Sequence, residues 1–413
     1  MTSPCEHKHC TGCLACLNIC RHNAILLHTD EEGFVYPHTD EEACINCGLC
    51  YKACPANDTE LKTSLPLRAY AAWAKNKDIH RHSSSGGLFS VISEFVLRQG
   101  GIVYGAAFDE EWNVIHTFAE SSRHLKKLRG SKYAQSNIKY SYKEIEQKLK
   151  AGTKVLFVGT PCQIAGIKQF MSIKKTNTDN MITIDLACHG VPSPLIFKKY
   201  LNYLENKHHS KLSHYMFREK KWSWKRFNTK AIFKNHCCYR GKWEEDIYMR
   251  GFLRDLFLRE SCHTCKYACQ IRQGDITLSD YWNYWPRENE IINNDTGVSV
   301  VLTNTSKGSD IIQAIKNELL IYPREIDDAL HSSQPYIKPF PASPLRDEFW
   351  TDYKTHDFSY LIEKYFFPEP INPHYAHIYK YGRYFSPYAK KIHDKFGGII
   401  NKMISIFRQS KTI

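Results

Sequence analysis

The chain has 413 residues, 42% of them hydrophobic and 24% charged, and a formal net charge of +13 at pH 7. This composition is that of a folded protein and excludes a disordered or low-complexity chain, while the length predicts two or three domains. No stretch approaches the roughly 18 consecutive apolar residues of a membrane-spanning helix, and the first residues, MTSPCEHKHC, lack the apolar core of a secretory signal. We therefore expect a cytoplasmic protein.

Cysteines dominate the first part of the chain. There are 16 of them in all, and nine lie within the first 54 residues. In a reducing compartment, such a number indicates metal ligands rather than disulfides. Two runs share the spacing C-x2-C-x2-C-x3-C, which is the pattern of bacterial two-cluster ferredoxins. The runs are Cys10, Cys13, Cys16 and Cys20, and Cys44, Cys47, Cys50 and Cys54.

In two-cluster ferredoxins, the fourth cysteine of each run ligates the other cluster. We therefore assign Cys10, Cys13, Cys16 and Cys54 to one [4Fe-4S] cluster, and Cys44, Cys47, Cys50 and Cys20 to a second. Zinc is the alternative, but zinc sites usually take separated pairs of ligands. Between the runs, segments 24–29 and 34–38 flank a turn and predict a hairpin. Residues 1–62 are interpreted as a ferredoxin domain, with Cys5 as a spare thiol in a mobile tail.

A second domain is expected after a polar linker at residues 60–68, starting near Ala69. There, Ser84, Ser85, Gly86 and Gly87 precede a segment whose apolar spacing predicts a helix. The free N–H groups of such a helix start favour a cofactor phosphate, and the alternative is an ordinary serine cap. Segments 102–108 and 114–120 predict a strand pair. Lys132 follows, and either meets an anion or faces solvent.

Two further strands are each expected to end close to a cysteine. Segment 155–158 predicts a buried strand that turns into a helix at Cys162, and segment 182–186 predicts another that runs into Cys188. Because ligands collect at the carboxyl ends of strands in open α/β sheets, these cysteines are expected to converge. With Cys262 and Cys265 they supply four thiolates, enough for a third [4Fe-4S] cluster or a structural zinc. Cys269 is a competing ligand.

Six motifs follow one another along this region: SSSGGLFS, GGIVYGAAFDE, RGSKYAQS, GTPCQIAG, DLACHGVPS and CHTCKYACQIRQGDITLSDYW. On these motifs the chain resembles the coenzyme F420 hydrogenase/dehydrogenase beta-subunit family, whose members are iron-sulfur flavoproteins. The resemblance implies FAD, bound by the Ser84–Gly87 loop, the Lys132 region and a turn made of Gly159, Thr160, Pro161 and Gln163. It also implies that the third cluster has the ligands Cys162, Cys188, Cys262 and Cys265, which ranks Cys269 lower.

The expected fold is therefore a two-cluster ferredoxin module followed by a mixed α/β flavin-binding domain, of class α+β or α/β. The family-like part divides into residues 69–150 and 151–335. An aromatic and basic extension covers residues 336–413, and its amphipathic end either contacts a membrane surface or partner, or packs on the protein's own core. Members with a fused ferredoxin resemble bacterial proteins linked to cell-surface polysaccharide synthesis.

The expected activity is an electron relay. A redox donor protein or reduced ferredoxin supplies single electrons, and FAD collects two for a hydride transfer to coenzyme F420 or another small-molecule acceptor. The alternative is a non-catalytic electron-transfer subunit of a larger redox complex. Lys132 and His189 are the candidate proton donors. The basic, aromatic segment 219–227 carries no recognised nucleic-acid module, so no nucleic-acid partner is expected. Three clusters would lower the net charge to roughly +7, which suits an anionic partner.

Overall fold

The computed structural model describes residues 3–58, 65–293 and 295–366. The chain divides into two compact units, and the features below belong to the larger one, Met1–Tyr281 with Pro286–Phe367. Within the described ranges, no helix combines the length and the apolar character needed to cross a bilayer. The predicted amphipathic end of the chain lies outside the described residues.

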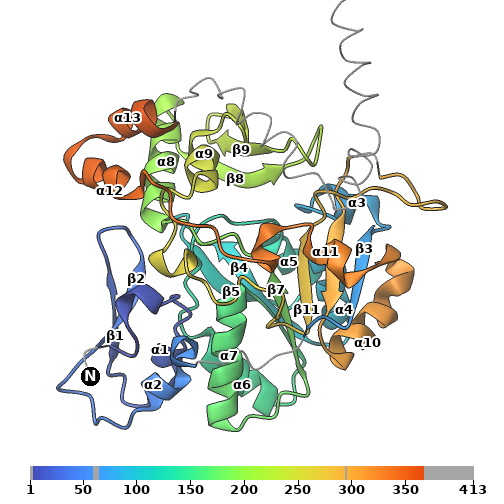
Figure 1. Ribbon diagram of the computed structural model, residues 1–413, viewed down its shortest axis with the longest axis horizontal. Coiled ribbons are helices and arrows are strands. Elements are labelled where there is room, and N and C mark those ends of the chain that lie inside the picture. Colours follow the sequence, from blue (N-terminus) through green and yellow to red (C-terminus); the bar gives the residue numbers. More distant parts are fainter. Residues whose placement is uncertain (1–2, 59–64, 294, 367–413) are drawn as a thin grey trace, which may run out of the picture. The chain divides into compact units, whose positions relative to one another are not determined.

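The N-terminal module, blue in Figure 1, consists of a hairpin and two short helices. Strands β1 (Ile25–Thr29) and β2 (Val35–Thr39) pair antiparallel, which confirms the predicted hairpin. Helices α1 (Ala15–Ile19) and α2 (Leu49–Ala53) each begin after a residue in the left-handed conformation, and each ends at the fourth cysteine of its run. The two helices pack against each other and bring the two cysteine runs together.

The core of the unit is an eight-stranded sheet with the strand order β13-β3-β12-β11-β7-β6-β4-β5. Strand β7 is parallel to both β6 and β11, and β6 is also parallel to β4, whereas the other neighbours are antiparallel. The strands are β3 (Arg68–Ala74), β4 (Ile102–Phe108), β5 (Val114–Ala119), β6 (Val155–Val158), β7 (Met181–Leu186), β11 (Ile276–Asp280), β12 (Ser299–Thr303) and β13 (Leu319–Arg324). The strands predicted at 102–108, 114–120, 155–158 and 182–186 are confirmed. The linker predicted at residues 60–68 extends one residue too far, because Arg68 already belongs to β3.

Helices cover both faces of this sheet, because neighbouring residues of a strand point to opposite sides. Tyr104 and Phe157 pack on one side with α6, α7 and α1 of the N-terminal module. Val103 and Leu156 pack on the other side with α4, α5 and α10. The helices around the sheet are α3 (Lys77–Arg81), α4 (Leu88–Arg98), α5 (Ser122–Leu128), α6 (Ser141–Lys150), α7 (Pro161–Lys174), α10 (Ser306–Ile315) and α11 (Ile326–Leu330). This mixed architecture confirms the predicted fold class.

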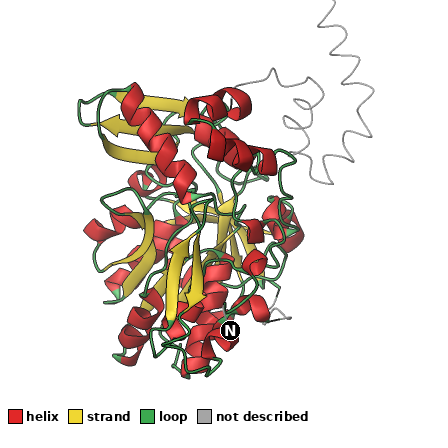
Figure 2. Cartoon of the chain, turned by 90° about the vertical axis from the view of Figure 1, so that its left-hand side faces the viewer, coloured by secondary structure: helices red, strands yellow, loops and turns green. Residues whose placement is uncertain are grey.

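A second, three-stranded sheet with the order β10-β9-β8 lies beside helices at the top of Figure 2. Its strands are β8 (Leu212–Glu219), β9 (Asn228–Phe233) and β10 (Cys238–Lys242), and the nearby helices are α8 (Pro194–Lys207), α9 (Ile247–Leu253), α12 (Arg346–Thr355) and α13 (Phe358–Leu361). Phe217 on β8 lies 5.0 Å from Phe197 and 6.2 Å from Phe108 on β4, measured between ring centroids. Aromatic packing therefore joins the small sheet to the large one.

The ends of the parallel strands are fixed by local hydrogen bonds. After β6, Thr160 and Gln163 form a capping box at the start of α7, in which the Thr160 N–H donates to Gln163 Oε1 at 2.9 Å. On β7, the buried carboxylate of Asp185 accepts hydrogen bonds from the Gln273 N–H at 2.8 Å and from Arg272 at 3.4 Å. These contacts tie β7 to the segment that leads into β11.

Candidate metal and cofactor sites

Four cysteines of the N-terminal module form a buried group, the first thiol group. Its members, Cys10, Cys13, Cys16 and Cys54, are 6–8% exposed. Burial, followed by the charges of Cys13, Cys10 and Cys54, raises the pKa of Cys16. Burial, followed by Cys54, likewise raises the pKa of Cys13. The structure thus brings together the four thiols that the crossed ligand pattern assigns to one cluster, and their role as ligands stays a prediction.

The remaining cysteines of the two runs form the second thiol group, which lies nearer the surface. Cys47 is exposed, and Cys20, Cys44 and Cys50 are partly buried. Burial raises the pKa of Cys50, with smaller contributions from Cys20 and Cys44. A Cβ added at Gly48, next to Cys47, would meet no atom within 4 Å. The second group is therefore the one that an external partner can approach.

A third group of thiols, the core group, lies where β6 and β7 end. Burial, followed by Cys262, Cys162 and Cys265, raises the pKa of Cys188. Burial and Cys162 raise the pKa of Cys265 to about 11, and Cys269 contributes less to this rise. The structure therefore brings Cys162 and Cys188 together, and it places Cys162 near the other three predicted ligands. Cys269 lies beside Cys265.

The chemistry of these groups fits an iron-sulfur cluster. Burial and neighbouring thiols disfavour the thiolate form of Cys13, Cys16 and Cys188, so four thiolates in one group need a positive centre such as cluster iron beside them. Four thiolates are also the usual donor set of a [4Fe-4S] cluster. No three His, Cys, Asp or Glu side chains in the described part of the chain are arranged for a single metal ion.

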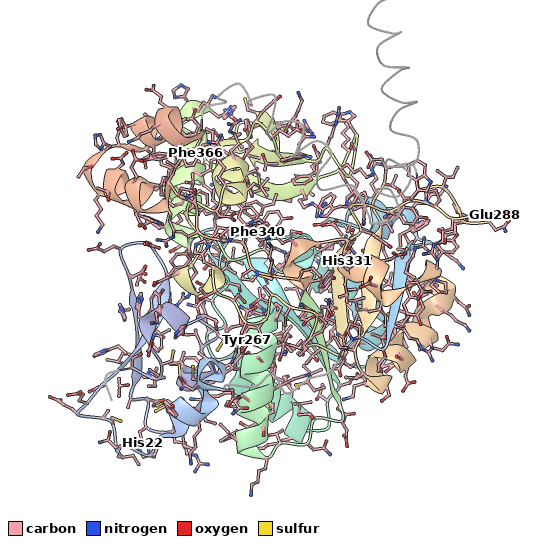
Figure 3. All side chains as sticks on the ribbon, in the orientation of Figure 1. His22, Tyr267, Glu288, His331, Phe340 and Phe366 are labelled. Carbon is pink, nitrogen blue, oxygen red and sulfur yellow. The ribbon has the colours of Figure 1, made fainter. Side chains whose placement is uncertain are left out.

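The first group and the core group meet on helix α7. A Cβ added at Gly166 would lie 3.1 Å from Cys13 Sγ, so the glycine lets the module approach the helix closely. The side chain of Thr11 hydrogen-bonds to Cys162. Tyr267, labelled in Figure 3, lies near both groups. Its pKa is raised by burial and, to a smaller extent, by the neighbouring Cys13 and Cys162. The first group and the core group are thus linked through side chains.

The three segments predicted to hold a flavin are connected to one another. The Ser131 N–H donates to Ser84 Oγ at 2.8 Å, and Gln163 Nε2 donates to the Ser136 carbonyl at 3.4 Å. Residues 131–136 therefore link the Ser84–Gly87 loop to the turn after β6. This arrangement is compatible with one flavin site, and the flavin itself stays a prediction.

Lys132 is partly buried, and its side chain is engaged by protein groups rather than left free in solvent. Its Nζ donates to the carbonyl oxygens of Lys127, Leu128 and Arg129 at 3.1, 3.0 and 2.9 Å, which closes the end of helix α5. Burial lowers the pKa of Lys132 to about 7. A role of Lys132 toward a flavin or a proton stays a prediction.

The Ser84–Gly87 loop does not provide an ordinary serine cap. Helix α4 has Gly87 at its N-cap position and no side-chain cap, while Ser84 and Ser85 bond to Ser131 and to the Val298 carbonyl. A Cβ at Gly86 would lie 2.4 Å from the Ala72 carbonyl, so packing against β3 already requires that glycine. Since Ser84, Ser85 and Gly86 are engaged in packing and hydrogen bonds, the uncapped N–H groups of α4 are the feature that supports a phosphate site.

The other candidate proton donor, His189, is held by two neighbours. Its Nε2 lies 2.6 Å from Asp255 Oδ1, and its ring stacks on Phe340 with the centroids 3.7 Å apart. Phe340 is labelled in Figure 3. These contacts fix the imidazole next to Cys188, and its participation in proton transfer stays a prediction.

Three family models match the chain one after another. A 4Fe-4S dicluster domain matches residues 9–57. The N-terminal and C-terminal domains of the coenzyme F420 hydrogenase/dehydrogenase beta subunit match residues 69–141 and 152–329. The chain belongs to this beta-subunit family. It is a member with an iron-sulfur domain at its N-terminal side, and the resemblance seen in the six motifs is confirmed.

The relatives of this beta-subunit-like chain include proteins of Methanocaldococcus jannaschii. Its coenzyme F420-dependent sulfite reductase is 24% identical over 323 residues, which are 74% of this chain and 46% of the relative. An uncharacterized protein is 29% identical over 205 residues, 40% of this chain and 54% of the relative. An uncharacterized ferredoxin is 33% identical over 63 residues, 15% of this chain and 80% of the ferredoxin. The chain spans about half the length of the first two relatives.

Among solved structures, a similar chain occurs in the F420-reducing [NiFe] hydrogenase complex of Methanosarcina barkeri, determined as a xenon derivative. The similarity covers 71% of this chain and 89% of that chain, at 16% identity and a TM-score of 0.42.

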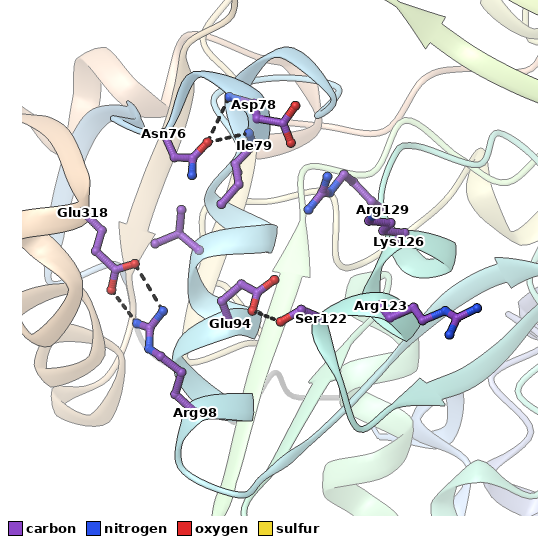
Figure 4. Close-up of a pocket in the computed structure, with 11 residues that line it drawn as sticks. Asn76, Asp78, Ile79, Glu94, Arg98, Ser122, Arg123, Lys126, Arg129 and Glu318 are labelled. Carbon is purple, nitrogen blue, oxygen red and sulfur yellow. Dashed lines mark hydrogen bonds and ion pairs between the residues drawn. The ribbon is translucent and has the colours of Figure 1, made fainter.

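A pocket of about 540 Å³ lies among α3, α4 and α5 and is drawn in Figure 4. Its lining is polar and internally paired, since Arg98 bonds Glu318 at 2.5 Å and Ser122 bonds Glu94. None of the residues predicted to hold the flavin of this beta-subunit-like chain lines the pocket. The pocket therefore gives no support to the predicted flavin site.

Sequence reasoning missed three residues close to these sites. Cys5 is not a spare thiol in a tail, because it packs with Phe34 and Tyr36 and hydrogen-bonds to Cys10 and Cys54. Lys220 donates to the Ser85 carbonyl, although nothing in the sequence connects it with that loop. Arg259 donates to the Cys10 carbonyl from a position three residues before Cys262, and no sequence signal connects it with the first cysteine run.

Proposed function

We propose that this member of the beta-subunit family is an iron-sulfur flavoprotein oxidoreductase with three [4Fe-4S] clusters and FAD. The second thiol group would hold the cluster that meets a redox donor protein or reduced ferredoxin. The first thiol group and the core group would hold the next two. FAD, when bound, converts single-electron transfer into two-electron chemistry. A small-molecule acceptor completes the reaction.

The observation that carries this proposal is the contact between the first thiol group and the core group. Thr11, which follows Cys10, bonds to Cys162, and Cys13 lies against Gly166 on the same helix as Cys162. A ferredoxin module that acted independently would have no reason to pack one of its cysteine loops against a cysteine of the core domain. The exposure of Cys47 supports the second group as the entry point.

Coenzyme F420 is the acceptor that we propose, and the family description together with the F420-dependent relative supports it. No residue described above identifies the acceptor by its own chemistry. A role in cell-surface polysaccharide synthesis stays a prediction. His189 and Lys132 remain the candidate proton donors.

Anaerobic iron and sulfide analysis tests the number of clusters. Three clusters require about twelve iron and twelve sulfide per chain, and two require about eight. Cys162→Ser should lower the iron from about twelve to about eight and spare the two clusters of the module. Cys238→Ser is the matched control, because Cys238 is exposed and lies on β10 outside the three groups. Loss of iron in Cys269→Ser but not in Cys162→Ser would reverse the ligand assignment.

The enzymatic part of the proposal has a separate test. The flavin released from anaerobically purified protein should be FAD, and the isolated chain should reduce coenzyme F420 with a reduced viologen as donor. Cluster reduction without any turnover would instead support the alternative, a non-catalytic electron-transfer subunit.

A further inference from the structure

Arg259 is a buried cation between the first thiol group and the core group. It follows helix α9 and immediately precedes the turn Glu260–Cys262, and its exposed fraction is 0%. Its Nε donates to the Cys10 carbonyl at 2.6 Å, and its Nη2 lies 3.4 Å from Cys10 Sγ. Its Nη1 donates to Gln135 Oε1 at 2.8 Å. One guanidinium therefore holds the first cysteine run against the core.

The same residue contacts both groups. Its Nη2 contacts Cys10 Sγ in the first group, at 3.4 Å. On the core side, the Arg259 carbonyl accepts a hydrogen bond from the N–H of Cys262 at 2.9 Å. Arg259 is thus in contact with predicted ligands from two neighbouring groups.

Among the described residues, no carboxylate pairs directly with this charge. The ion pairs found there do not include Arg259, and the acceptors of its guanidinium are carbonyl oxygens, an amide oxygen and a thiol. The ring of Tyr36 lies 3.9 Å below the guanidinium and also carries no full charge. A buried charge without a counter-charge is strongly unfavourable. The sulfur of Cys10, 3.4 Å from Nη2, is the group in direct contact with the guanidinium that can carry a negative charge.

We propose that Arg259 is a positioning residue that docks the first cysteine run on the core and raises the reduction potentials of the two neighbouring clusters together. A cluster becomes more negative on reduction, so a nearby positive charge stabilises its reduced form more than its oxidised form. If one electron passed from the first cluster to the core cluster, the first would be oxidised and the second reduced, and Arg259 would gain or lose no proton or bond. A charge that raises both potentials would leave the difference between them largely unchanged. The inference rests on the proposed core cluster.

Three variants of the full chain test this inference. Arg259→Gln removes the charge, and Arg259→Lys keeps the charge but loses the planar fork that binds two acceptors. Arg346→Gln is the matched control, because Arg346 also joins the module to the core but pairs with Glu32 rather than with a cysteine. Midpoint potentials are measured by mediated titration followed by EPR. Cys47→Ser and Cys162→Ser backgrounds assign each midpoint to its cluster.

In Arg259→Gln we expect the equilibrium constant for reduction to fall at least tenfold for the first cluster and for the core cluster. For a one-electron couple, a tenfold fall lowers each midpoint potential by about 59 mV. The midpoint of the second cluster should stay unchanged, as should all midpoints in Arg346→Gln. Equal shifts in all three clusters, or no shift in any, would overturn the proposal.

Loss of the first cluster in Arg259→Gln, seen as about four fewer irons, supports the docking role. The charge is then tested by Arg259→Lys, whose first-cluster midpoint should stay near the wild-type value. A tenfold fall in the equilibrium constant for reducing the first cluster of Arg259→Lys would show that the charge of Arg259 does not set this potential. If wild-type protein holds only about eight irons, the proposed core cluster fails. The first-cluster midpoint still decides the role of Arg259 in that case.

Discussion

The first and second thiol groups have ligands from the same two cysteine runs, yet their surroundings differ. Cys13 and Cys47 are both second in their runs, but Cys13 is 6% exposed and lies against α7, while Cys47 is exposed. The local motif cannot account for this difference, because the spacing is identical. Packing of one side of the module on the core decides which group is enclosed and which can face a partner.

The largest expected effect comes from comparing these two positions directly. Cys13→Ser puts a hydroxyl without an assured partner into a buried site beside α7, which costs about 1–3 kcal/mol in addition to the lost cluster. Cys47→Ser should lose its cluster with little change in the rest of the fold. The apparent Tm, measured anaerobically at one scan rate, should therefore fall clearly further for Cys13→Ser. Equal Tm values would break the comparison.

A smaller effect is expected at the glycine that lets the first group approach α7. A Cβ at Gly166 would lie 3.0 Å from Tyr142 Oη and 3.1 Å from Cys13 Sγ, so neighbours must move. Such overpacking costs about 1–3 kcal/mol, whereas helix propensity favours alanine by about 1 kcal/mol. Gly166→Ala should be less stable by about 1 kcal/mol in net.

The control for this prediction is Ser172→Ala, an exposed position on the same helix, which should change stability by no more than about 0.5 kcal/mol. Denaturant unfolding of the two variants measures both values. A more stable Gly166→Ala would mean that the module does not press on the helix there.

The smallest effect concerns pH and the docked hairpin. Burial raises the pKa of Glu32 above its ordinary value of 4.5, although Arg346 pairs with it and acts in the opposite direction. The folded state then binds more protons than the unfolded state just above pH 4.5, so stability falls as the pH rises through that window. Glu32→Gln should flatten this slope by an amount within about 1 kcal/mol.

Thermal unfolding between pH 4 and 7 measures the slope. Glu31→Gln is the matched control, because Glu31 is the neighbouring residue and its pair with Lys354 is exposed. An identical slope in wild type and Glu32→Gln would show that the docked side of the module does not bury this carboxylate.

Local patterns predicted much of this molecule. The hairpin, the parallel strands β6 and β7, and the grouping of Cys54 with Cys10 follow from periodicity and spacing. Contacts between distant parts of the chain were not predictable in this way. Arg259 and Cys10 are 249 positions apart, and nothing near either residue specifies the other. Lys132 was read as a solvent or anion contact because its partners, the last carbonyls of α5, become visible only when the helix end is known.

The Asp185 network has a consequence for how the protein matures. It fixes β7, which leads to Cys188, and the segment before β11 by hydrogen bonds between protein groups, which need no metal. Helices α1 and α2 have five residues each, too few to be stable by themselves, and metal binding is coupled to folding in such modules. If both sites hold the proposed clusters, iron would therefore enter a largely preformed site in the core, whereas in the N-terminal module it would take part in building the site.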